Sequence, residues 1–220
     1  APVDVVLETD SRKPEAKHRI LELYVEHGLV LPDTPVMALH RGRIDLLEAH
    51  LARDPSHLSR RFRHDEIYPP ELGCHDEAQA TQGTPLAGTT LLHLCADYDE
   101  LEIAAWLIAR GMDVNLTAEV DADGFGGHTA LFGTVVSQPA FWMNYGGQPQ
   151  VAPFTELLLA HGADPHVRAS LRKQLHPGYG DHPLREYRYV TALSWGRRFE
   201  EKVFVSEPAM RLIEAAGGLP

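Results

Sequence analysis

The stretch GTTLLHLCADYDELEIAAWLIARGMDVN, from Gly88 to Asn115, predicts two short helices that pack as a pair. Thr90 suits the start of the first helix, because its hydroxyl can accept a hydrogen bond from a free amide of the first turn. The second helix is predicted to start near Asp99 and Glu102 and to end before Gly111, since glycine readily adopts the left-handed conformation that ends helices. Apolar residues at helical spacing give this second helix one buried face: Ile103, Ala104, Trp106, Leu107 and Ile108.

This stretch resembles the ankyrin repeat, a unit of roughly 33 residues that folds as a turn and two helices around the motif T-P-L-H-x-A. The residues at the motif positions are, in order, Thr90, Leu91 in place of the usual proline, Leu92, His93 and Ala96. The closing residues 111–115 match the family's G-A-D-V-N except at Met112. The resemblance implies that His93 hydrogen-bonds to the backbone of the neighbouring turn and that Cys95 is a reduced thiol in the core.

Weaker copies of this unit, interrupted by insertions, account for the rest of the chain. Gly111, Gly162 and Gly217, which end second helices, are 51 and 55 residues apart rather than roughly 33, so the repeats are not contiguous. We expect one ankyrin-repeat domain over residues 1–220, with approximate repeats at 1–31, 32–55, 88–117, 124–168 and 188–220. The insertions are expected at 56–87, 137–152, 169–187 and 197–206.

The expected fold class is all-α: an ankyrin-repeat solenoid of stacked helix-turn-helix units with protruding hairpin and loop insertions. Strands are expected only in the fingers and in the insertion near Tyr179, where the turn residues 177–180 lie between partly alternating polar arms. The segment 3–7 fits the first helix of an end repeat or a strand equally well.

The composition is that of an acidic chain with an ordinary apolar content. Hydrophobic residues make up 44% and charged residues 23% of the 220 positions, which is enough apolar material for a packed core. The formal net charge of −11 disfavours nucleic-acid binding, and the short basic runs 60–63 and 197–198 are interpreted as surface charge. No apolar run approaches the roughly 20 residues needed to span a bilayer, so no membrane partner is expected.

The cysteine count and the first residues bear on the compartment. Two cysteines do not make a disulfide framework, which fits a cytoplasmic protein, and we expect a monomer. The chain begins APVD, without an initiator methionine or a secretory signal, so we expect that it is trimmed or that a leader has been removed.

The resemblance implies a protein-interaction module whose partner segment lies across the fingers and the first helices. The variable positions that it assigns to the unidentified partner protein are His40 and Arg41, Asp97 and Tyr98, Val136 and Ser137, and Arg198 and Phe199. Aromatic residues of the finger and the insertions complete the predicted surface: Phe125, Trp142, Tyr179 and Tyr187. The alternative for the insertion aromatics, which also include Phe141, Tyr145 and Tyr189, is a set of small local cores that fix each loop to the repeats.

Tyr98 is the predicted anchor of this surface. It follows Asp97 at the variable end of the central first helix, next to the finger that carries Phe125. An aromatic side chain near the middle of a concave face is well placed to be desolvated by a partner. Its removal is therefore expected to weaken binding and to leave stability unchanged.

Histidine is abundant, with 13 residues, so a metal-binding protein or metal-dependent enzyme is the alternative. The insertion residues 57–77 include the potential zinc ligands His57, His64, Cys74, His75, Asp76 and Glu77. Their spacing matches no known ligand pattern. The sequence also lacks a phosphate-binding glycine loop with its lysine, a G-x-S-x-G elbow and an H-E-x-x-H motif. We therefore expect no enzyme, no bound metal and no cofactor; a second alternative is a scaffold segment of a larger multidomain protein.

Overall fold

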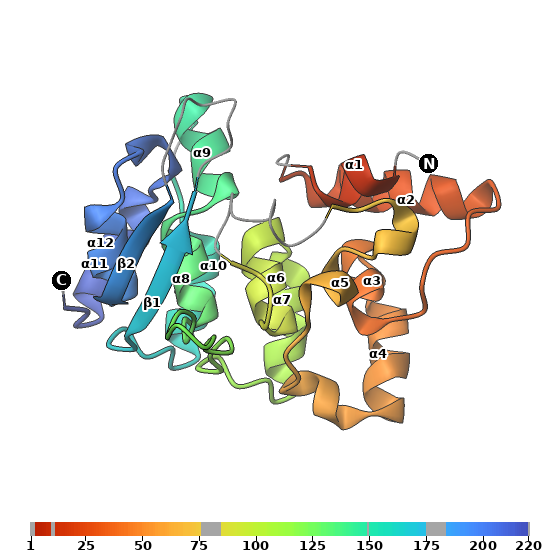
Figure 1. Cartoon of the computed structure of the whole chain (residues 1–220), viewed down its shortest axis with the longest axis horizontal. Helices are drawn as coiled ribbons and strands as arrows, with labels where there is room; N and C mark the ends of the chain where they lie inside the picture. The colour runs from red at the N-terminus through yellow and green to blue at the C-terminus, as the bar shows by residue number, and fades with distance from the viewer. Residues whose placement is uncertain (1–2, 10–11, 76–84, 149, 175–183, 220) are drawn as a thin grey trace.

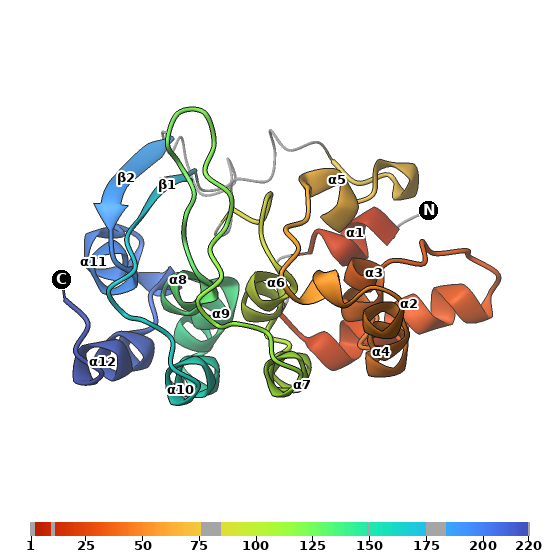
Figure 2. The same cartoon turned by 90° about the horizontal axis from the view of Figure 1, so that it is seen from below.

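Figure 1 shows the computed structural model of the chain, which describes residues 3–9, 12–75, 85–148, 150–174 and 184–219. Short helices pack side by side in pairs along the molecule. The first helices of the pairs are α3 (Pro35–His40), α6 (Leu91–Tyr98), α8 (Ala130–Val135) and α11 (Ala192–Arg198). The second helices are α4 (Ile44–Arg53), α7 (Leu101–Ala109), α10 (Pro153–Ala160) and α12 (Glu207–Ala215). In Figure 2 the second helices lie in a row along one edge, with the first helices beside them.

The N-terminus and the insertions add further elements. The N-terminal segment contains α1 (Val3–Leu7), which settles the open choice at 3–7 in favour of a helix, and α2 (Pro14–Glu26). The helical elements of the insertions are η1 (Pro55–Leu58), α5 (His64–Ile67), η2 (Pro70–Leu72), α9 (Gln138–Tyr145) and η5 (Lys202–Phe204). Strands β1 (Ala169–Lys173) and β2 (Arg185–Val190) pair antiparallel. The fold is predominantly helical as predicted, with a small sheet in the insertion where strands were predicted; the turn 177–180 lies outside the described residues.

Capping residues start and end the helices where the sequence predicts. The Thr34 hydroxyl accepts a hydrogen bond from the Met37 amide at 3.1 Å, and a proline occupies the first turn of α3. Thr90 and His93 cap α6 reciprocally, with the Thr90 amide donating to His93 Nδ1 at 3.3 Å. Gly111 follows α7 in the left-handed conformation, with φ of 93°. These local contacts explain why the helices are short and have defined ends.

The glycine-rich finger that follows the central repeat is held against the strand hairpin. Gly126 has φ of 118°, and any side chain there would collide with the backbone of Glu119. The Gly126 amide donates to the Ser170 carbonyl oxygen at 2.7 Å, and the Ser170 amide donates back at 3.2 Å. Arg172 of β1 pairs with Asp123 of the finger at 2.8 Å. The finger therefore forms part of the folded body at this end of the molecule.

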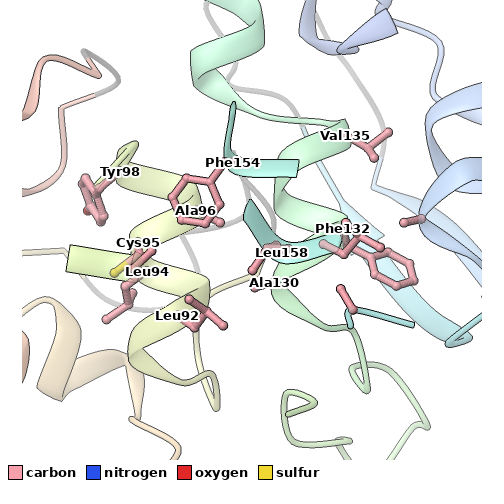
Figure 3. Close-up of a cluster of buried hydrophobic side chains, with 14 of the residues drawn as sticks. Leu92, Leu94, Cys95, Ala96, Tyr98, Ala130, Phe132, Val135, Phe154 and Leu158 are labelled. Atoms are coloured by element: carbon pink, nitrogen blue, oxygen red, sulfur yellow. The ribbon is translucent and has the colours of Figure 1, made fainter. Parts of the chain in front are cut away.

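The hydrophobic core runs from α3 to α12 and leaves the N-terminal helices largely outside it. The core includes Leu107 and Trp195, whose side chains are 0% exposed, and Figure 3 shows part of it between α6, α8 and α10. A separate small cluster contains Val3, Leu7, Leu21 and Met37. Tyr68 packs against both clusters. The N-terminal helices are therefore attached through this small cluster and through the polar contacts described next.

Candidate functional site

Tyr98, the predicted anchor of an open groove, lies beneath the N-terminal segment. Its side chain is 2% exposed, and its hydroxyl donates to the Leu7 carbonyl oxygen at 2.8 Å and lies 2.6 Å from the Tyr68 hydroxyl. The Arg12 guanidinium and the Lys17 ammonium group lie 4.6 and 4.0 Å from the centre of its ring. The predicted exposure of Tyr98 is therefore wrong, because the chain's own N-terminus covers this residue.

Two buried ion pairs attach the N-terminal segment to the end of α6. Arg12 pairs with Asp97 at 2.8 Å and Lys17 pairs with Glu100 at 2.9 Å, and none of the four side chains is more than 7% exposed. His18 adds a contact of 2.8 Å to the Glu100 carboxylate. Desolvation lowers the pKa of Lys17 despite the attraction of Glu100. Asp97, predicted to face a partner, thus has its carboxylate engaged within the chain.

Most other residues of the predicted groove are also buried. The His40 ring is 0% exposed and lies edge-on to the Tyr98 ring, with the ring centres 4.9 Å apart. Its Nε2 is 3.2 Å from the Ile67 carbonyl oxygen. Desolvation holds the pKa of His40 well below the usual value. The remaining buried members of the predicted surface are Phe125, Val136, Ser137, Tyr187 and Phe199. The prediction that these side chains line an exposed groove is corrected, because they pack between repeats or under the insertions.

Three residues of the predicted surface reach solvent. Arg41 is half-buried and pairs with Glu22 at 2.5 Å, while Arg198 is exposed with its guanidinium 5.8 Å from the Tyr187 ring centre. Trp142 of α9 is 44% exposed. Tyr179 lies outside the described residues. Among these three residues only Trp142 is aromatic, and it lies on helix α9.

Helix α9 projects from the row of repeats and is fixed at its base (Figure 1). Phe141 stacks on Phe204 of η5 at 4.8 Å, and the Asn144 amide donates to the carbonyl oxygens of Val203 and Val205 at 2.8 and 3.0 Å. The insertion thus has the local core that the sequence left as an alternative. Tyr145, next to Phe141, is 75% exposed. With Trp142 it presents two aromatic rings to solvent from a held helix.

A small, open surface recess lies at the base of α9, bounded by α8, α10 and the end of α6. Apolar groups from Met143, Val151 and Phe154 form much of its wall, and Figure 3 shows Phe154 beside Ala96 of α6. Thr155 also lines it, and its buried hydroxyl has no hydrogen-bond partner within the described part of the chain.

Asp99, at the end of α6, completes the lining of the recess. It has φ of 61°, a left-handed conformation in which glycine and asparagine are usual, and its carboxylate stands at the negative end of the helix dipole. Although the side chain reaches solvent, local desolvation and the neighbouring Glu100 carboxylate raise its pKa to about 6, and Arg12 acts in the opposite direction. An aspartate is therefore unfavourable for the fold at this position.

Asp99→Asn is expected to stabilise the protein at neutral pH. The pKa of the Asp99 carboxyl is about 6 in the folded protein, against an ordinary value of 3.8. The folded protein is therefore destabilised relative to the unfolded chain as the pH rises through this interval. Asparagine removes the charge and suits the left-handed conformation; because the side chain is exposed and screened, the gain is about 1 kcal/mol or less. Thermal melts should show a higher midpoint for the variant at neutral pH and a smaller difference below about pH 4, where the charge no longer contributes. A lower midpoint at neutral pH would show that the carboxylate supports the fold.

The histidines of the central repeats have structural roles. His93 Nε2 lies 3.0 Å from the His128 carbonyl oxygen, in the neighbouring turn, as the resemblance implied. His128 Nε2 in turn lies 3.0 Å from the Pro85 carbonyl oxygen. Desolvation lowers the pKa of His93 to about 4 and that of His128 to about 3, so both rings are neutral at physiological pH.

The described residues do not bring potential metal ligands together. Within them, no group of three or more histidine, cysteine, aspartate or glutamate side chains is placed to hold a metal ion. His64 Nε2 is 3.1 Å from the His75 carbonyl oxygen, and burial raises the pKa of the Cys74 thiol to about 12. Asp76 and Glu77 lie outside the described residues. Across the same described ranges, no helix has the length and apolar character to cross a membrane.

The protein-family model described as ankyrin repeat matches residues 87–119, which contain α6 and α7. A solved structure of an ankyrin repeat domain from Acinetobacter baumannii AYE is similar, with 17% sequence identity, a TM-score of 0.39, and coverage of 99% of this chain and 98% of that one. No curated protein matches the chain.

Proposed function

The chain is an ankyrin-repeat protein, and we propose that it binds a partner protein segment through α9 and the recess at its base. Ankyrin repeats are generally protein-interaction modules, so the family supports an interaction role. The position of the binding surface is a proposal from this chain's own insertion. We also propose that it acts as a monomer in the cytoplasm, a location that fits the free thiols of Cys74 and Cys95.

The observation that carries this proposal is the pair of exposed aromatic rings on α9. Tryptophan and tyrosine are the residue types that most often anchor interfaces, because they bury large areas with few rotatable bonds. Trp142 and Tyr145 are exposed while Phe141 and Asn144 hold their helix in place. A held helix loses little conformational entropy on binding, which favours affinity. Loops and insertions on a repeat scaffold are also where binding residues concentrate.

The burial of Asp97 and Tyr98 at the end of α6 favours a binding surface on α9 over one in the predicted groove. A partner that entered at Tyr98 would first have to displace Arg12 and Lys17 together with their ion pairs. No such rearrangement is needed at Trp142. The proposed surface therefore uses side chains that are already accessible.

The test compares three forms of the full chain as baits in native cell lysate. Trp142→Ala should reduce recovery of the specific partner, and its affinity once purified should fall about tenfold or more. Val30→Ala, at a residue 86% exposed and far from α9 along the chain, is the matched control and should retain the partner. Thermal midpoints of all three should agree. A partner that Trp142→Ala retains as well as the wild type does would contradict the proposed surface.

A further inference from the structure

The acidic residues around the end of α6 differ in how they are neutralised. Asp97 is paired with Arg12, and Glu100 with Lys17 and His18. Between them, the Asp99 carboxylate has neither an ion pair nor a hydrogen bond with the described residues. Asp99 lies at the recess rather than under the N-terminal segment. The turn thus presents one unneutralised carboxylate, and it does so at the edge of the recess.

A second polar group of the recess also lacks a partner. The Thr155 side chain is 0% exposed, and its hydroxyl makes no hydrogen bond within the described ranges. The other hydroxyls of the lining are engaged: Thr134 donates to the Leu131 carbonyl oxygen at 2.8 Å, and Ser137 accepts from the Ala140 amide at 3.2 Å. A buried hydroxyl without a partner is unfavourable, and a ligand that supplies a donor relieves this penalty.

The rest of the recess is apolar. Met143 comes from α9, Val151 from the segment that precedes α10, and Phe154 from the first turn of α10. Long basic side chains bury their hydrocarbon stem on such a surface while the charged end reaches a polar group. Trp142, beside Met143 in the sequence and exposed, offers an aromatic face that also attracts cations.

From this combination we infer that the recess receives a lysine or arginine side chain of the partner segment, with its cationic end at Asp99 and its stem against Met143 and Phe154. The inference rests on the proposed function and names the chemistry of its partner: a basic segment with an apolar neighbour. An N–H of the cation can also donate to the Thr155 hydroxyl. One carboxylate and one hydroxyl are too few ligands for a structural metal ion, which favours an organic cation.

The charge of the whole molecule agrees with a basic partner. The formal net charge is −11, so a basic segment is attracted over distance and an acidic one is repelled. Aspartate at position 99 is unfavourable for the fold, because its carboxylate lies at the negative end of α6 and next to Glu100. A residue that weakens the fold at a surface recess is more readily explained by binding than by stability.

The test uses a phage-displayed library of random peptides as the probe, panned on the full chain. Peptides enriched on the wild-type protein should share a lysine or arginine next to an apolar residue. Their synthetic forms should bind Asp99→Asn at least about tenfold more weakly, since the variant keeps the shape and loses the charge. Affinity should fall with ionic strength for the wild type and much less for Asp99→Asn. Val30→Ala is the control and should bind as the wild type does.

Several other results would overturn the inference, and they distinguish its failure from failure of the proposed surface. Enriched peptides without a basic residue, or with equal affinity for Asp99→Asn but reduced affinity for Trp142→Ala, would reject the basic side chain and leave α9 as the binding surface. Peptides that bind both variants as tightly as the wild type, or a library that yields no enriched peptide, would reject the proposed surface as well. A peptide whose basic residue can be replaced by glutamine without loss also rejects the inference.

Discussion

Tyr98→Ala is expected to lower the free energy of unfolding by about 3–5 kcal/mol, as for other large aromatic side chains removed from a core. The side chain is 2% exposed and packs between the N-terminal segment and α6. Its removal leaves a cavity, takes away the cation–π contacts of Arg12 and Lys17, and leaves the Tyr68 hydroxyl without this partner. Each consequence acts in the same direction.

Urea unfolding of the variant and of Tyr98→Phe separates packing from hydrogen bonding. Phenylalanine keeps the ring and removes the hydroxyl, which contacts Leu7 and Tyr68, so a smaller loss of about 1–2 kcal/mol is expected. A loss below about 1 kcal/mol for the alanine variant would contradict the burial of the ring and return Tyr98 to an exposed groove.

The repeats themselves could be predicted because their signals are local. Thr90 and His93 lie three residues apart and cap the same helix, and Gly111 ends the next one. The hairpin could be predicted for the same reason, because alternating arms flank a turn. Such patterns depend on residues that are near one another in sequence, and the structure contains the helices and strands that they predict.

The position of Tyr98 could not be predicted from local pattern. The groups that cover it come from Leu7, Arg12 and Lys17, about 80–90 residues earlier in the chain. In the sequence Lys17 is a polar residue of an amphipathic helix, and nothing in α2 indicates that its ammonium group points inward. Asp97 and Tyr98, which the resemblance assigned to a partner, lie at the end of α6, but the resemblance gave no account of how the N-terminal segment covers them.

The proposed surface on α9 includes one residue that its type alone singles out, Trp142. The sequence predicts an insertion at 137–152 rather than a helix. A signal for the helix was present: Ser137 followed by Pro139 is a cap and a first-turn proline, and the Ser137 hydroxyl accepts from the Ala140 amide at 3.2 Å. The sequence does not indicate a binding role for Asp99 or Thr155, because the recess joins residues of α6, α8, α9 and α10 and has no sequence motif.

Glu100→Gln is expected to destabilise the protein by about 3–5 kcal/mol, because it leaves the Lys17 ammonium group buried without its counter-charge. Glu100 and Lys17 are 3% and 5% exposed in their side chains and lie 2.9 Å apart. Glutamine keeps the shape, and the backbone amide at this position can still donate to the Cys95 carbonyl oxygen, so the loss reports the charge. The pKa of Lys17, already lowered by desolvation, should fall further without the carboxylate.

The double variant Lys17→Met, Glu100→Gln tests whether the loss of stability in Glu100→Gln comes from the unpaired charge of Lys17. With both charges removed, no buried cation remains, and methionine fills much of the lysine stem's volume, so a large part of the lost stability should return. Urea unfolding of the wild type, both single variants and the double variant gives the coupling energy between the two positions. A double variant as unstable as the sum of the single ones would mean that the pair does not hold the N-terminal helices. If the pair does hold them, proteolysis in the 8–13 segment should be faster in Glu100→Gln than in the wild type. It should return toward the wild-type rate in the double variant. This segment is the one expected to respond because it carries Arg12, which contacts Tyr98 and Asp97.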